Sequence, residues 1–164
     1  KMLFPGIQGG PLENIIAAKA VCFLEASKPE FRIYAEQVIA NAKTLAAQLE
    51  KNAFRLVSAG TDNHLLNIDF GTDSCTGKEA ESWLEKANII VNREMVPRDT
   101  RKPYISSGIR LGTPTLTTRG FQETEMKQVA NLITSVLRAK GDEKMLQEVA
   151  KDALILANKY PFQD

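Results

Sequence analysis

Arg110 is the residue whose setting in the sequence points most directly to chemistry. It lies inside an apolar run that glycines bound on both sides, at positions 108 and 112. An arginine in such a place is costly unless an anion pairs with it, because the guanidinium cannot shed its charge. Its planar donors suit a carboxylate held by two parallel hydrogen bonds. Two interpretations follow: Arg110 binds the carboxylate of a ligand, or it forms an ion pair with an acid of this chain.

A second candidate site is the segment Gln8-Gly9-Gly10-Pro11, which comes just before a predicted helix. The first backbone N–H groups of a helix have no partner within it, and the helix dipole favours an anion there. Gly9 and Gly10 would then offer backbone donors to a phosphate. The same four residues are also typical of a tight turn without a ligand.

The histidine and the two cysteines complete the candidates. His64 follows Asp62 and Asn63 in a predicted turn, where it either transfers protons or forms local hydrogen bonds. Cys22 and Cys75 have no basic neighbour in sequence, so we expect buried or inert thiols. One histidine excludes a zinc site with two histidines from this chain, and two cysteines make neither a disulfide framework nor a metal cluster. We expect no metal and a reducing, cytoplasmic setting.

Composition excludes several classes of protein. The 164 residues include 21 Lys+Arg and 20 Asp+Glu, and the net charge of +1 argues against broad nucleic-acid binding. No apolar run approaches the roughly 20 residues that a membrane span needs. We expect no signal peptide in this sequence, because residues 1–10 lack a long apolar stretch. The chain begins with Lys1 and runs straight into Phe4-Pro5-Gly6, so we expect that it was cut from something longer.

The first half of the chain predicts helix and then strand. Apolar residues at helical spacing run from position 12 to 49, and Lys28-Pro29 interrupts them, which gives one kinked helix or two helices end to end. Residues 54–58 and 65–70 are predicted to be strands separated by a turn. Thr76 and Glu79 have the spacing of a capping box, so a helix should follow to about residue 87.

The second half predicts two short strands and two helices. The strands are residues 89–91 and 108–112, with an irregular charged segment at 93–106 and a loop at 113–120. Amphipathic helices are predicted at 121–140 and 143–159. These elements favour an α+β domain, in which helices pack on a small, mostly antiparallel sheet and a long helix precedes it. One compact domain, with an extension, is expected at this length.

Several motifs together, rather than any one, resemble a known family. They occur in the order Phe4-Pro5-Gly6-x-Gln8-Gly9-Gly10-Pro11, Gly60-Thr61-Asp62-Asn63-His64-Leu65, Thr76-Gly77-Lys78-Glu79-Ala80, Ala87-Asn88-Ile89 and Ser107-Gly108-Ile109-Arg110-x-Gly112-Thr113-Pro114. Their order and spacing resemble serine hydroxymethyltransferase, a pyridoxal-phosphate (PLP) enzyme. The resemblance covers essentially all of this chain but only the last part of the family's chain.

The resemblance implies a fold and a reaction. The fold is the aspartate-aminotransferase type (fold type I), in which residues 1–45 would end the large PLP domain and form a connecting helix, and residues 46–164 would form the small C-terminal domain. The reaction interconverts serine and glycine and passes the one-carbon unit to tetrahydrofolate, in a homodimer with PLP as cofactor.

The resemblance also implies roles for individual residues. Gly9 and Gly10 match the loop that reaches the PLP phosphate from the neighbouring subunit, and Arg110 matches the arginine that holds the amino-acid carboxylate. Folate contact is implied for Lys102, Pro103 and Tyr104. Glu94 stands where some members have a folate-contacting asparagine, and a carboxylate cannot donate a hydrogen bond as an amide does.

The family's Schiff-base lysine has no counterpart here. In the family it follows a histidine, whereas His64 is followed by Leu65. We therefore expect this chain alone to be inactive and to expose the apolar face that met the large domain. Two alternatives remain: another PLP enzyme of the same fold type, such as an aminotransferase, or a non-enzymatic interaction module in which Arg110 is a structural ion pair.

Overall fold

Two helices occupy most of the first 51 residues of this computed structural model, which describes residues 1–72 and 74–161. Helix α1 (Glu13–Ala26) ends before Lys28, and helix α2 (Pro29–Lys51) starts at the proline. Proline is tolerated in the first turn of a helix because the N–H that it lacks has no partner there. The interruption at Lys28-Pro29 therefore separates two helices, which is one of the two predicted outcomes.

The chain divides into two compact units, Lys1–Ala35 and Glu36–Asp164. In the first unit, α1 has no buried residue. Large apolar side chains are exposed throughout this unit; Phe23, for example, is 69% exposed. A helix that is apolar on all sides is normally covered by other protein. This unit therefore exposes apolar surface, while the face predicted to have met a large domain stays a prediction.

The second unit contains a four-stranded antiparallel sheet. Its strands are β1 (Arg55–Leu56), β2 (Leu65–Asp69), β3 (Asn92–Glu94) and β4 (Gly108–Gly112), in the spatial order β1-β2-β4-β3. Strand β4 has the bounds that were predicted for it from the sequence. Arg110 lies in the middle of β4, opposite Asn67 of β2 and Asn92 of β3.

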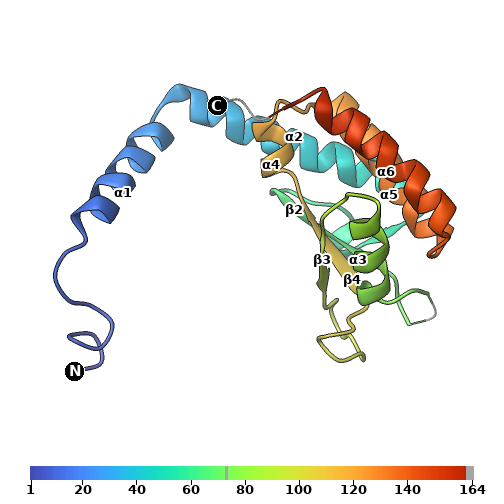
Figure 1. Cartoon of the computed structure of the whole chain (residues 1–164), viewed down its shortest axis with the longest axis horizontal. Helices are drawn as coiled ribbons and strands as arrows, with labels where there is room; N and C mark the ends of the chain where they lie inside the picture. The colour runs from blue at the N-terminus through green and yellow to red at the C-terminus, as the bar shows by residue number, and fades with distance from the viewer. Residues whose placement is uncertain (73, 162–164) are drawn as a thin grey trace. The chain divides into compact units, whose positions relative to one another are not determined.

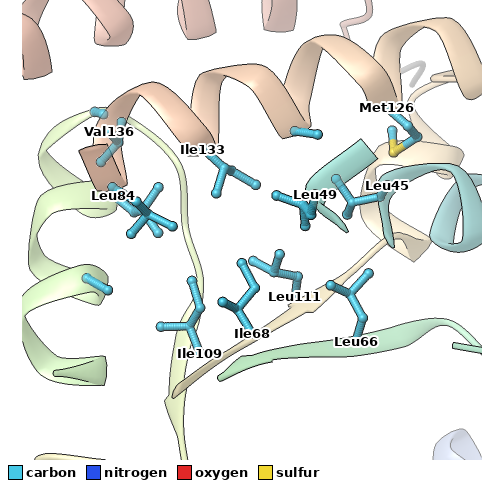
Figure 2. Close-up of a cluster of buried hydrophobic side chains, with 14 of the residues drawn as sticks. Leu45, Leu49, Leu66, Ile68, Leu84, Ile109, Leu111, Met126, Ile133 and Val136 are labelled. Atoms are coloured by element: carbon cyan, nitrogen blue, oxygen red, sulfur yellow. The ribbon is translucent and has the colours of Figure 1, made fainter. Parts of the chain in front are cut away.

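The core covers one face of this sheet. Alternate residues of the strands point into it, because side chains of a strand alternate between the two faces. Figure 2 shows these strand residues facing the second half of α2, α3 (Gly77–Lys86) and α5 (Glu123–Ala139). The labelled members are Leu45, Leu49, Leu66, Ile68, Leu84, Ile109, Leu111, Met126, Ile133 and Val136. Helix α6 (Glu143–Asn158) packs alongside α5 (Figure 1).

Helix α3 begins with the predicted capping box. The Thr76 hydroxyl accepts a hydrogen bond from the Glu79 N–H at 3.1 Å, and the Glu79 carboxylate accepts one from the Thr76 N–H at 2.8 Å. The bonds from the Thr76 backbone and hydroxyl hold the pKa of Glu79 below its ordinary value. The two residues therefore satisfy donors that a helix terminus would leave free.

Three predicted segments differ from the structure. Residues 89–91 do not form a strand; the Ile89 N–H bonds to the Leu84 carbonyl at 2.9 Å and closes the end of α3, so pairing starts only at Asn92. In the segment 54–58 only β1 pairs, because the chain then turns through a short 3-10 helix (Val57–Ala59). The predicted loop 113–120 contains helix α4 (Pro114–Thr118), which starts with a proline.

The two C-terminal helices are confirmed, with ends one or two residues from the predicted ones. The described residues thus form an α+β arrangement of helices on a small antiparallel sheet. None of the described helices combines the length and the apolar character that crossing a membrane requires.

Candidate functional site

Arg110 points to the face of the sheet opposite the core. Its neighbours along β4, Ile109 and Leu111, are buried, so the alternation of the strand turns Arg110 the other way. The two residues opposite it, Asn67 and Asn92, lie on the same face. The Arg110 side chain is 41% exposed, so its donors are within reach of solvent and of a ligand.

An open pocket of about 640 Å³ lies over this face. Its floor includes Leu65, Asn67, Arg110 and Glu94, and its wall is the chain from Val57 to Asn63. The wall is held by local hydrogen bonds, since the Asn63 side-chain oxygen accepts from the Leu65 N–H at 2.8 Å. Arg110 also lines a smaller neighbouring hollow of about 370 Å³. A guanidinium facing polar amides in an open pocket is suited to binding a small carboxylate.

Glu94 is the carboxylate nearest to this arginine in the structure. Its Oε2 atom lies 3.3 Å from Nη1 of Arg110, and its side chain is 35% exposed. Glu94 is opposite Gly108 in the ladder, so β3 and β4 bring the two side chains to the same face. An ion pair with an acid of this chain, one of the two interpretations of Arg110, is therefore present.

A hydrogen-bonded aspartate fixes the chain that leads into β4. Asp99 accepts bonds from the Ser107 N–H and from the Ser107 hydroxyl, both at 2.7 Å, and from the Arg101 N–H at 2.9 Å. Burial raises the pKa of Asp99, but the bonds from Ser107 and from the backbone outweigh it and hold the pKa below its ordinary value. Asp99 thus ties the loop to the residue just before β4.

The guanidinium of Arg101 anchors the same loop on its other side. It donates to the carbonyl oxygens of Cys75 at 3.2 Å, Thr72 at 2.8 Å and Ser74 at 3.3 Å. The loop between β3 and β4 is therefore held both to the start of β4 and to the segment before α3.

Lys102, Pro103 and Tyr104 lie on this loop and not among the residues that line the pocket at Arg110. The Lys102 ammonium is 5.9 Å from the centre of the Tyr104 ring, and Tyr104 is 58% exposed. Of the predicted site residues on the sheet and its loops, the structure brings Arg110 and Glu94 together.

Gly9 and Gly10 belong to the first compact unit and precede α1. Both are exposed, and a Cβ added to either would meet no atom within 4 Å. Their backbone is thus accessible to a group as large as a phosphate.

The two cysteines and the histidine do not line the larger pocket at Arg110, but His64 lines the smaller hollow beside it. Both thiols are free, Cys22 is exposed and Cys75 is half-buried, so burial, one of the two expected states, does not apply to Cys22. Burial raises the pKa of Cys75, which disfavours the thiolate. The His64 side chain is exposed. Among the described residues, no three histidine, cysteine or acidic side chains come together as a metal site would require.

Sequence reasoning missed Asn67 and Asp99. Asn67 alternates with the buried Leu66 and Ile68, and that period-2 pattern would have placed it on the open face of its strand. Asp99 has no comparable signal, because its bonds reach across a loop to Ser107.

Comparison with known proteins gives one consistent family. The family model described as serine hydroxymethyltransferase matches residues 1–133. Relatives of the same name are 48% identical over 161 residues in Methanospirillum hungatei, 51% over 160 residues in Mycoplasma capricolum and 49% over 159 residues in Acinetobacter baylyi. These matches cover 97–98% of this chain but only 38–39% of each relative. The chain belongs to the serine hydroxymethyltransferase family.

Proposed function

We propose that this chain is the C-terminal part of an enzyme that reversibly converts serine and tetrahydrofolate into glycine and 5,10-methylenetetrahydrofolate, with PLP as cofactor. The observation that carries the proposal is Arg110, which faces an open, polar pocket from a rigid central strand. Of the alternatives, the comparisons favour this family over an aminotransferase.

In this proposal Arg110 holds the amino-acid carboxylate. Two parallel hydrogen bonds to a planar carboxylate fix its orientation, and with it the bond at the α-carbon that faces the cofactor ring. Bound PLP supplies the electron sink for the bond that breaks. Gly9 and Gly10 fit the phosphate, because their accessible backbone precedes a helix N-terminus. Lys102, Pro103, Tyr104 and Glu94 are the proposed folate contacts.

The exposed apolar unit supports the idea that further protein covers this chain. Residues 1–45 would complete a large PLP domain of fold type I and connect it to a small domain of residues 46–164, in a homodimer. An apolar helix such as α1, with no buried residue, would be stabilised by that packing.

A chimaeric enzyme tests the proposed role of Arg110. This chain would replace the segment that it matches in the Methanospirillum hungatei relative, and serine turnover with tetrahydrofolate would be measured. We expect Arg110→Ala to lower kcat/KM for serine by roughly 100-fold, because the hydrogen bonds from the guanidinium to the substrate carboxylate are lost. Arg55→Ala is the matched control, since Arg55 also has a carboxylate oxygen at 3.3 Å, that of Asp69. Equal activity of the two variants would contradict the role of Arg110.

A second experiment tests whether this chain is inactive alone. PLP would be added to the chain, reduced with borohydride, and the labelled lysines located by mass spectrometry. We expect scattered labelling of surface lysines. One specifically labelled lysine would show that the chain carries its own attachment site.

A further inference from the structure

The carboxylate of Glu94 lies against one nitrogen of Arg110, inside the pocket proposed to take a ligand carboxylate. Both side chains line the same pocket, with 3.3 Å between Oε2 of Glu94 and Nη1 of Arg110. Arg110 is held in the central strand of the sheet by ladder partners on both sides, Asn67 and Asn92. Moving the guanidinium away from Glu94 through the backbone would therefore break the pairing of the sheet.

The sheet also places Glu94 within reach of the arginine. Glu94 is the last residue of the edge strand β3 and lies opposite Gly108 in the ladder. Because two strands of one sheet carry the partners, the Glu94 carboxylate is present at a high effective concentration near Arg110. Only rotation of the side chains separates the pair, and exposures of 41% and 35% leave room for that rotation.

A second carboxylate at Arg110 would meet competition. Glu94 presents the same chemical group as the ligand, and its Oε2 atom faces Nη1, one of the nitrogens from which a guanidinium donates to a carboxylate. Two carboxylates that share one arginine also repel each other at contact distances. An external carboxylate that uses Nη1 of Arg110 therefore has to displace Glu94.

We propose that Glu94 is an internal carboxylate that occupies Arg110 in the free protein and lowers the affinity of the site for external carboxylates. It is a specificity-determining residue, because a ligand must supply enough additional contacts to displace it. The identity of the natural ligand as an amino acid rests on the proposed function above. The competition itself rests only on the geometry of Glu94 and Arg110.

The test uses the full chain and sodium acetate as the probe. Acetate replaces chloride at constant ionic strength and pH 7, so that screening stays the same. The Nε–H resonance of Arg110 is followed by NMR and is assigned by its loss in Arg110→Lys. We expect Glu94→Gln to lower the Kd for acetate about 3- to 5-fold, the value of one partly exposed ion pair.

Glu81→Gln is the matched control. Its carboxylate pairs with Arg93, the residue before Glu94, at 3.4 Å, so the control removes the same charge from a similar ion pair. We expect it to change the Kd at Arg110 less than 1.5-fold, because it does not contact that guanidinium. Glu94→Asp keeps the charge and shortens the side chain, and should give an intermediate Kd if Glu94→Gln fails to fold.

Equal Kd values for Glu94→Gln and Glu81→Gln would overturn the proposal, and so would an Arg110 resonance that acetate does not shift in any of the proteins. The outcome is independent of the chimaera experiment. If Arg110→Ala left serine turnover unchanged there, the proposed function would fail while the competition between Glu94 and acetate would still be measured here.

Discussion

A methyl group added at Gly108 should disturb the strand that carries Arg110. A Cβ at this residue would lie 2.4 Å from the carbonyl oxygen of Ile68 and 2.7 Å from Cγ1 of Val96. Ordinary contacts of a Cβ begin at 3.4 Å, so the first of these is about 1 Å too short. Since the carbonyl belongs to the neighbouring strand β2, relief requires the sheet itself to open beside Arg110.

The magnitude follows from these contacts. Overpacking a rigid core costs about 1–3 kcal/mol, and a backbone oxygen in a central strand pair has little freedom to move. Replacing glycine with alanine restricts the unfolded chain and returns about 0.4–1 kcal/mol at most. Taking the upper end of the cost and subtracting the gain, we expect Gly108→Ala to lower the free energy of unfolding by about 2 kcal/mol. For a chain of this length that corresponds to a Tm lower by roughly 4–8 °C.

Gly112→Ala at the other end of β4 is the matched control. The nearest atom to its added Cβ is Cδ2 of Leu65 at 3.1 Å, the far end of a flexible side chain. We expect its free energy of unfolding to stay within about 0.5 kcal/mol of the unchanged chain.

Urea unfolding followed by the fluorescence of Trp83, the single tryptophan, measures both variants. Trp83 lies on α3 and packs against the core, so it reports unfolding without being altered by either substitution. If Gly108→Ala were as stable as Gly112→Ala, β2 would be free to move away and the argument from a rigid sheet would be wrong.

Three further predictions concern residues that hold the sheet and its helices. Because the pKa of Asp99 is lowered, its contribution to the free energy of unfolding is full above about pH 4 and is lost as the pH falls through the folded-state pKa. In acid titrations followed by circular dichroism, Asp99→Asn should flatten this pH dependence of stability. The same variant should cost about 1–3 kcal/mol at pH 7. Asn41 is fully buried and donates to the Phe121 carbonyl at 2.9 Å, so Asn41→Ala should cost about 2–3 kcal/mol in urea unfolding, whereas an effect below 0.5 kcal/mol would show that the bond is not needed. Thr76→Ala should cost about 1 kcal/mol by removing the cap of α3, measured as a lower Tm, and Thr76→Ser should restore most of it.

Local signals in the sequence were sufficient for several elements. The capping box at Thr76 and Glu79 depends on residues three apart, and so it could be predicted without knowledge of the fold. The bounds of β4 follow from the glycines that enclose it. Both features are determined by neighbours in sequence, which a pattern can read directly.

The partner of Arg110 could not be predicted in the same way. An apolar run at residues 89–91 indicated a strand there, but those residues close the end of α3, and pairing with β4 begins at Asn92. In the observed register Asn92 lies opposite Arg110 and Glu94 opposite Gly108, which places Glu94 on the open face beside Arg110. Register between distant strands depends on tertiary packing, so the pattern identified the arginine but not its carboxylate.

One face of the sheet packs against the core, and the other face carries Arg110 and the pocket. Because side chains alternate along β4, a slip of one residue in its register would exchange Arg110 with the buried Ile109 and place a charge in the core. The packing that stabilises the fold therefore also fixes the direction of Arg110. Core substitutions should reduce the folded population without changing the affinity of the molecules that remain folded. Substitutions of Glu94, on the open face, should change the affinity while the free energy of unfolding moves by at most about 1 kcal/mol.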